Sequence, residues 1–410
     1  MTSSAFLRRA VTSGLFIALA ATASPGVGAA ADDPPPVDAF RFVSMPDFLN
    51  ADIGDVAGSP YYRPGQPNST NASYETAIST ILDAVQAEGT PHLLIAGDFV
   101  EGHWGVDTAK TRTFGPLWTE VQKIAAVNLA ADTYYRQNLA RFTARGLILY
   151  PAVGDHEIGD NPWRRSAGGV EAFKWRNMSV FKNAFARTML KEANGTPRFG
   201  SRPDGQASGT AYAVRPHPEV QLISLDVFRR TTSDIVPEID YKQMAWLKGV
   251  LAAARADGVD WIVVQGHTPI VGPVRKQFSS ALMYQGGQTS ALWKVLKDNG
   301  VDLYLNGEFH DITAHHVDGI AQITHGGLIQ QGGVNYLVVD VTPGTMTLTV
   351  KRFAATSDWT VQPLLWQTDT TKAKASVVSV EPVPQTVGTM VIDRDLGLIE
   401  RTGLLEEYLG

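Results

Sequence analysis

The chain has 410 residues, of which 44% are hydrophobic and 19% charged; its formal net charge is −6, and it contains no cysteine. These proportions indicate a globular protein with a large core, in one large domain or two. An acidic chain is not expected to bind a nucleic-acid polymer, and the lack of cysteine excludes disulfides and thiolate metal sites.

The N-terminal residues predict a secretory signal peptide. Arg8 and Arg9 form a short positive region, an apolar run follows over residues 15–21, and Ala29 to Ala31 offer small residues for cleavage. We therefore assign residues 1–31 to a signal peptide and expect a secreted or periplasmic protein. No other segment is long and apolar enough to cross a bilayer, so no stable membrane insertion is expected. A proline-rich spacer is predicted at residues 32–39.

The first two predicted strands end in acidic residues. Alternation over residues 40–44 predicts a strand that leads to Asp47 and Asn50. An amphipathic helix is predicted over residues 74–85, and the apolar run 93–96 predicts a buried strand that ends at Asp98. The strand–helix–strand order favours parallel strands, whose carboxyl ends are where ligands bind in an open α/β sheet.

A third strand is predicted after a long helix. Residues 101–117 are predicted to form a loop, and helical periodicity runs from about residue 117 to 145. The strand predicted at 147–153 ends in the segment Gly154-Asp155-His156-Glu157, and helical character returns over residues 170–193.

The second half of the chain repeats the pattern of a strand followed by polar residues. A strand pair is predicted at 209–214 and 220–225, with helices at 240–254 and 289–299. The strand at 261–264 ends at His267, and the strand at 302–305 leads into Gly307-Glu308-Phe309-His310. Beyond residue 312, alternation at 321–324, 336–341 and 345–350 predicts antiparallel strands of a second sheet. We place the main domain at 40–355 and assign residues 356–410 to a C-terminal β-rich extension or arm.

Five strand ends therefore carry metal-ligand residue types. In chain order they carry Asp47 with Asn50, Asp98, Asp155 with His156, His267, and Glu308 with His310. As an ordered set they resemble the blocks of the calcineurin-like metallophosphoesterases, which read D-x-H, G-D, G-N-H-[DE], G-H and G-H-x-H. The resemblance covers about residues 40–350. It implies an α/β fold of four layers, an α/β/β/α sandwich of two mixed sheets.

The chain departs from the family pattern at three positions. Leu49 occupies the place of the histidine in the first block, Asp155 that of the asparagine in the third, and Glu308 that of a histidine in the last. The two polar exchanges make the set richer in oxygen, which favours harder ions such as Mn, Mg, Ca or Fe over an all-nitrogen zinc site.

The resemblance also implies a role for each residue. Two divalent or trivalent metal ions, chosen from Mn, Fe, Zn, Mg and Ca, would be bridged by Asp98. Asp47 and His310, with Asn50, would complete one metal site, and Asp155, His267 and Glu308 the other. His156 would protonate the leaving oxygen, and Glu157 would orient His156.

The predicted reaction is hydrolysis of a small phosphomonoester or phosphodiester by metal-activated water. His325, followed by two glycines, and Arg164, just after the third block, are weaker candidates for substrate binding. Two alternatives remain: a nucleotidase or phospholipid-type phosphodiesterase of the same fold, or a degenerate, non-catalytic metal-binding module. Loops over the strand ends, at 101–117, 157–210 and 270–290, would decide the substrate.

Overall fold

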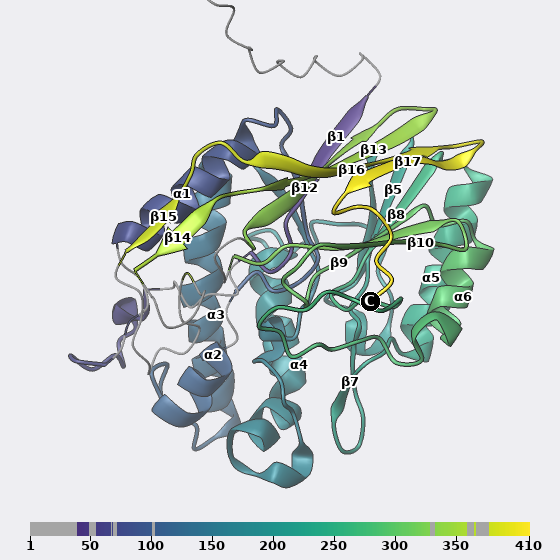
Figure 1. Cartoon of the computed structure of the whole chain (residues 1–410). Coiled ribbons are helices and arrows are strands. Elements are labelled where there is room, and N and C mark those ends of the chain that lie inside the picture. The colour runs from purple at the N-terminus through teal and green to yellow at the C-terminus, as the bar shows by residue number, and fades with distance from the viewer. Residues whose placement is uncertain are drawn as a thin grey trace, which may run out of the picture. The chain divides into compact units, whose positions relative to one another are not determined.

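Two mixed β-sheets form the centre of the protein (Figure 1). The computed structural model describes residues 39–48, 55–66, 68, 72–100, 103–328, 333–358, 365 and 377–410, all within one compact unit, Pro36–Gly410. The seven-stranded sheet has the order β17 (Gly397–Gly403), β16 (Gln385–Asp393), β13 (Thr345–Arg352), β12 (Asn335–Val341), β1 (Phe40–Ser44), β2 (His92–Ile95), β3 (Ile148–Pro151). The six-stranded sheet has the order β10 (Thr313–Val317), β11 (Ile320–Thr324), β9 (Leu303–Asn306), β8 (Trp261–Gln265), β5 (Val220–Ser224), β4 (Tyr212–His217).

Each sheet contains a set of neighbouring parallel strands, whose carboxyl ends lie at one edge of that sheet. In the seven-stranded sheet β1, β2 and β3 are parallel neighbours, and in the six-stranded sheet β11, β9, β8 and β5 are. Strands β5, β8 and β9 are buried along their whole length, as expected for parallel strands covered on both faces. The carboxyl ends of these strands are therefore brought together, and the polar residues that follow them lie at one end of the molecule.

Helices cover the strands on both sides. Figure 1 shows α1 (Ala72–Gln86) and α3 (Glu120–Thr143) on the left of the strands and α5 (Tyr241–Ala256) and α6 (Ala291–Asp298) on the right. A capping box at Thr119 starts α3, and Asp240 and Ser290 cap α5 and α6 through their side chains. The predicted sandwich of two mixed sheets and helices is confirmed.

The two sheets contact each other through polar as well as apolar side chains. Gln265 on β8 donates from Nε2 to the carbonyl of Tyr150 on β3 over 2.8 Å. The hydroxyl of Tyr212 on β4 donates to the carbonyl of Pro151 over 3.1 Å. These bonds link β8 and β4 to β3 close to the ends that carry the site.

Two segments differ from or extend the sequence predictions. The predicted loop 101–117 contains α2 (His103–Val106) and a π-helical turn, Asp107–Thr111, because so short a stretch shows no helical period in the sequence. Near the C-terminus β14 (Ala355–Ser357) pairs with β15 (Val378–Val380), and β16 pairs with β13 inside the seven-stranded sheet. The division at residue 355 stays a prediction, and the signal peptide and residues 32–38 of the spacer lie outside the described residues.

Among the described residues, no helix combines the length and apolar character needed to cross a bilayer.

Candidate metal centre

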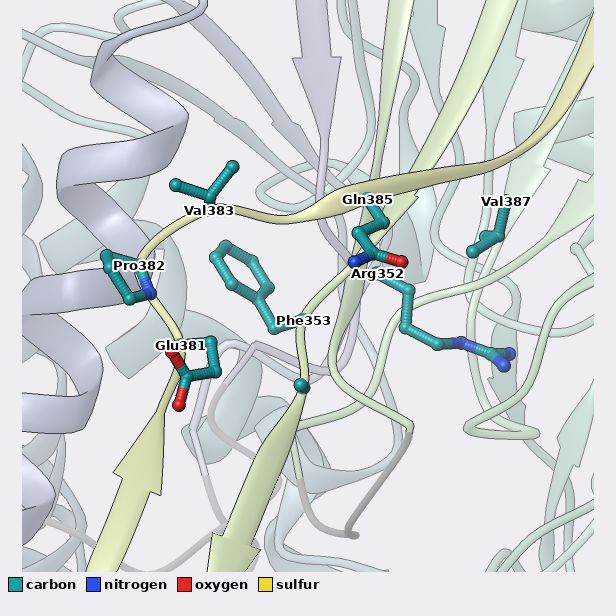
Figure 2. A pocket seen from close by; sticks show the side chains of 8 residues that line it. Arg352, Phe353, Glu381, Pro382, Val383, Gln385 and Val387 are labelled. Atoms are coloured by element: carbon teal, nitrogen blue, oxygen red, sulfur yellow. The ribbon is translucent and has the colours of Figure 1, made fainter. Parts of the chain in front are cut away.

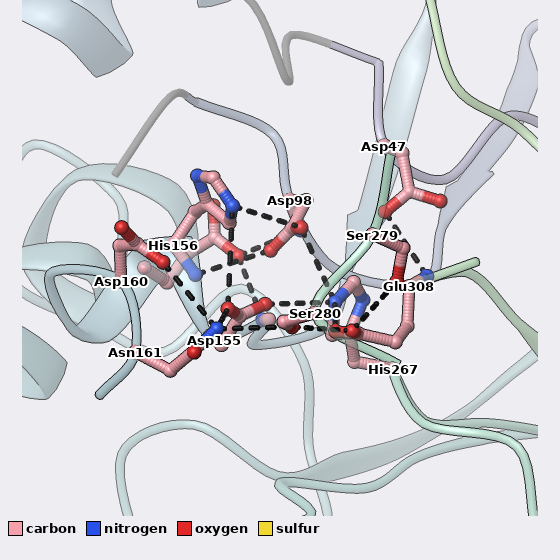
Figure 3. Close-up of polar contacts among 12 residues, drawn as sticks. Asp47, Asp98, Asp155, His156, Asp160, Asn161, His267, Ser279, Ser280 and Glu308 are labelled. Atoms are coloured by element: carbon pink, nitrogen blue, oxygen red, sulfur yellow. Dashed lines mark hydrogen bonds and ion pairs between the residues drawn. The ribbon is translucent and has the colours of Figure 1, made fainter. Parts of the chain in front are cut away.

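Ligand-type side chains converge where the parallel strands end (Figure 3). Asp47 follows β1, Asp98 follows β2, and Asp155 with His156 follows β3; His267 follows β8, and Glu308 with His310 follows β9. The carboxylates of Asp47, Asp98, Asp155 and Glu308 are between 0% and 2% exposed.

Four of these residues hold a strained backbone. Asp47, Asp98, Glu308 and His310 have φ angles of 52°, 55°, 72° and 55°. The left-handed region costs a non-glycine residue about 1–3 kcal/mol and is retained chiefly at functional sites. All four residues belong to the turns that follow β1, β2 and β9, where the ligand-type side chains meet.

Glycines next to the ligands leave the space that the carboxylates need. A Cβ atom on Gly154 would overlap Asp98 Oδ1, and one on Gly307 would overlap Asp47 Oδ2. Gly97 has φ of 93° and lies against the ring of His267. Any larger residue at 154 or 307 would displace a ligand.

The ligand atoms form two overlapping groups. Asp47, Asp98 and His310 each offer an atom within 4.8 Å of the others, and so do Asp98, Asp155 and His267. Asp98 belongs to both groups, so its carboxylate lies between them. This is the arrangement that two cations bridged by one carboxylate require.

His267 occupies the centre of the second group. Its Nε2 lies 3.2 Å from Asp98 Oδ2, 3.1 Å from Asp155 Oδ1 and 3.4 Å from Glu308 Oε2. Its Nδ1 donates to the carbonyl of Ala96 over 2.9 Å, because a carbonyl can only accept. That bond places the ring proton on Nδ1 and leaves the Nε2 lone pair free for a metal.

Further hydrogen bonds orient Asp155 and Glu308. Asn161 donates from Nδ2 to Asp155 Oδ2 over 2.8 Å and to Ser280 Oγ over 3.0 Å. Ser279 and Ser280 donate to Glu308 Oε1 over 3.0 and 2.6 Å. Each carboxylate thus commits one oxygen to this network and directs the other, Asp155 Oδ1 or Glu308 Oε2, at His267.

Glu157 has a different position from the one predicted. Its carboxylate accepts hydrogen bonds from the backbone N–H groups of Gly154, Asp98 and Phe99, over 2.7, 2.8 and 2.9 Å. It therefore holds the turn after β2 against the turn after β3, rather than orienting His156. The side chain is fully buried, and burial raises the pKa of Glu157.

His156 lies at the rim of the site. Its side chain is 12% exposed, and its Nε2 lies 3.7 Å from Asp98 Oδ2 and 4.0 Å from Asp155 Oδ2. A third group of possible ligand atoms consists of Asp155, His156 and Asp160. His156 is thus the imidazole that a ligand above the metal groups would meet first.

The charge balance of the site fits bound cations. In the described part of the chain, no lysine or arginine pairs with the four carboxylates, and Asp47 Oδ2 is buried without a hydrogen-bond donor. Burial raises the pKa of Asp47 well above its ordinary value and that of Asp98 to about 7. Burial also lowers the pKa of His310 to about 3, so this ring is a neutral ligand. Carboxylates so placed need positive charge to stay ionised.

The raised pKa of His267 also reflects the negative charge of the carboxylates around it. Burial alone would lower it, but the Asp98, Asp155 and Glu308 carboxylates raise it well above the ordinary value. A second proton, on Nε2, would compensate part of the negative charge that a bound cation would otherwise neutralise.

Three predicted residues are not among these ligand groups. Asn50 lies outside the described residues. His325 follows β11, has no exposed surface, and bonds from Nε2 to Ser44 Oγ over 3.0 Å. Arg164 is largely exposed and pairs with Glu171 over 3.2 Å. The contacts of His325 and Arg164 therefore do not support a role for either residue in binding a substrate at the metal groups.

Sequence reasoning missed Asn161, Ser279, Ser280 and Asp160. Asp160 and Asn161 directly follow the Gly154–Gly159 turn, so an acidic and an amide residue next to the third block were an available signal. The serines had none, since they belong to an irregular loop far from Glu308 in sequence.

A separate concavity of about 470 Å³ lies at the junction of β13, β14 and β16 (Figure 2). Phe353, Pro382, Val383 and Arg352 line it, with Glu381 as the one carboxylate among its described residues. With a single carboxylate and an apolar floor it lacks the ligand atoms of a metal centre.

The fold and the site define a hydrolase that acts on phosphoester bonds with the help of metal ions. The sequence model described as calcineurin-like phosphoesterase matches residues 51–311, more than half of the chain. The protein belongs to this calcineurin-like phosphoesterase family, and the resemblance inferred from the sequence is confirmed.

Solved structures support the fold. A dimetal phosphatase from Danio rerio is 16% identical with a TM-score of 0.50, covering 76% of this chain and 96% of its own. PhoD is 14% identical with a TM-score of 0.52, covering 91% of this chain and 73% of its own. The search of curated proteins returns no match.

Proposed function

We propose that this protein is a secreted phosphoesterase that hydrolyses small phosphomonoesters or phosphodiesters with two bound metal ions. The observation that carries the proposal is that Asp98 belongs to two groups of ligand atoms at once. The side chains that we expect to hold the two ions are Asp47, Asp98 and His310 for one, and Asp98, Asp155, His267 and Glu308 for the other.

The protein's own residues would position and protonate the substrate. When bound, the two cations would supply Lewis acidity to the nucleophilic water and to the phosphoryl oxygens. Asp98 holds its place through the backbone of the turn that Glu157 secures. His156 directs Nε2 toward the same space as the ligand atoms, where it can give a proton to the leaving oxygen.

The donor set supports a proposal about the metals. The four residues expected to hold the second ion offer three carboxylates and one imidazole, because Asp155 and Glu308 stand where the family pattern has an amide and a histidine. Such an oxygen-rich set favours Mn, Fe, Mg or Ca over Zn.

The test is hydrolysis of aryl phosphates by the mature protein reconstituted with each metal in turn, with bound metals quantified. We expect hydrolysis with two ions per chain, and a loss of roughly 10³-fold or more in Asp98→Asn. Asp132→Asn, an acid on α3 outside the site, is the matched control. Asp98→Asn with wild-type activity would refute the proposal. Binding of a single Ca without hydrolysis would favour a non-catalytic module.

The proposed secretion rests on Arg8, Arg9 and the apolar run 15–21. Expression with the native N-terminus, followed by N-terminal sequencing of the exported protein, tests it. We expect cleavage after the alanines near residue 31; retention of the full chain inside the cell would contradict it.

A further inference from the structure

A groove lined by arginines opens between α4 (Gly169–Met189) and β6 (Phe228–Arg230). It has a volume of about 690 Å³, and no carboxylate is present among the described residues that line it. The residues used below, here called the arginine groove, are Arg165, Trp175, Arg176, Arg229 and Arg230. In a chain of net charge −6, such a concentration of one sign of charge needs an explanation.

Two of the four guanidinium groups are held in place without an ion pair to any described residue. Arg165 and Arg230 lie over the ring of Trp175, at 5.2 and 5.5 Å from its centroid. Arg165 donates to the carbonyl of Thr232 over 3.3 Å, and Arg230 to that of Arg176 over 3.1 Å. Within the described chain, Arg229 alone among the arginines of the groove forms an ion pair, with Glu238. Three guanidinium charges thus remain available to an anion.

A buried ion pair joins α4 to the segment that leads into β6. Lys182 on α4 lies 2.5 Å from Asp226, and their side chains are 5% and 0% exposed. Lys182 also donates to the carbonyl of Phe228 over 2.7 Å, which ties the start of β6 to α4. Because these bonds are satisfied and buried, Arg230 and Trp175 are held in a fixed relation before any ligand arrives.

The arginine groove lies next to the metal groups. The ring of Phe228 is 6.1 Å from that of His267, and Arg230 is two residues farther along β6. Asn161 bonds Asp155, and Arg165 is four residues farther along that segment. Since a chain advances at most about 3.5 Å per residue, both routes place the backbone of the groove within roughly 20 Å of the ligand atoms.

We propose that the arginine groove binds a second phosphate group of the substrate. The preferred substrates are then phosphoesters that carry a further phosphate within roughly 20 Å of the scissile one. Guanidinium groups present paired donors that match the oxygens of a phosphate, and they remain charged at every physiological pH. This inference rests on the proposed function, because it assigns the substrate class of that same site.

The test compares two esters that differ by one phosphate, hexane-1,6-diol bisphosphate and hexyl phosphate, on the metal-loaded protein. We expect the kcat/KM of the bisphosphate to exceed that of the monophosphate about tenfold, mainly through KM. Arg165→Gln and Arg230→Gln should each lower that ratio about fivefold. Arg136→Gln, an exposed arginine on α3, should keep the wild-type ratio. The proposal would be overturned if the wild-type ratio of the two kcat/KM values were near one. It would also be overturned if both groove variants kept the wild-type ratio.

A second variant and a binding measurement separate the possible failures. The side chain of Arg176 is exposed and makes no hydrogen bond with the described chain, so Arg176→Gln tests the charge without disturbing the fold. Calorimetric binding of hexane-1,6-bisphosphonate and hexylphosphonate needs no turnover. If the bisphosphonate binds more tightly and the groove variants lose that advantage, the groove is supported even when neither ester is hydrolysed, and only the proposed function fails. Equal binding of both phosphonates would refute the groove.

Discussion

Replacing Gly154 by alanine should disable both metal groups at once. A Cβ at this position would overlap Asp98 Oδ1 and would lie 2.5 Å from Asp98 N and 2.9 Å from Asp98 Cγ. The backbone cannot give way easily, because Gly154 N donates to the buried carboxylate of Glu157. The shared carboxylate of Asp98 must therefore move.

The size of the effect follows from these contacts. To restore an ordinary contact of about 3.5 Å, the Asp98 carboxylate must shift by roughly 1 Å or more. Overpacking of this kind costs about 1–3 kcal/mol of stability, and a misplacement of 1 Å costs about 10²-fold in rate. Both ions should bind more weakly, because both depend on Asp98.

The assay measures hydrolysis of an aryl phosphate, metal ions per chain and the midpoint of thermal unfolding. Gly200→Ala is the matched control, because no atom lies within 4 Å of a Cβ there and its φ is not positive. Gly154→Ala with wild-type activity and two ions per chain would show that the shared carboxylate is not where we place it.

Three further changes test other parts of the structure. Glu157→Ala leaves four buried backbone donors without this acceptor, including Val100 N at 3.4 Å. It should lower the free energy of unfolding by about 3 kcal/mol or more, measured by urea denaturation of metal-free protein; an unchanged midpoint would contradict this role. Ser280→Ala removes a donor to Glu308 and should weaken metal binding about 10–100-fold in calorimetry while the fold is kept, and equal affinity would mean that the serine does not orient this carboxylate. Burial raises the pKa of Asp302 from 3.8 to about 6, so its contribution to stability is complete below pH 4 and is lost as the pH rises through 6. The difference is worth about 3 kcal/mol, and Asp302→Asn should flatten the dependence of unfolding free energy on pH between 4 and 7; an unaltered slope would refute it.

Much of the architecture is predictable because parallel strands leave a strong local signal. The apolar runs at 93–96, 261–264 and 302–305 correspond to β2, β8 and β9, within one residue at each end. Once these strands are known to be parallel, the polar residues after them must lie at one edge. The convergence of Asp98, His267 and His310 follows from that pattern.

The supporting contacts could not be predicted, because they join segments whose proximity appears only in the folded chain. Ser280 reaches Glu308 across 28 residues, from a loop without periodicity. Glu157 was expected to orient its neighbour in sequence, but the pairing of β2 with β3 brings the N–H groups of the Asp98 turn within its reach. Trp163 and Tyr284, in loops expected to shape the pocket, are buried at 2% and 4% exposure and belong to the core. In each case tertiary packing, not local pattern, decides the role.

The central claim is that one carboxylate, Asp98, joins two cations held by the ends of separate strands. Anomalous diffraction from crystals of the metal-loaded protein tests it most directly. We expect two peaks about 3.5–4 Å apart, with Asp98 between them, His310 beside one and His267 beside the other. A single peak, or peaks away from these residues, would contradict the claim.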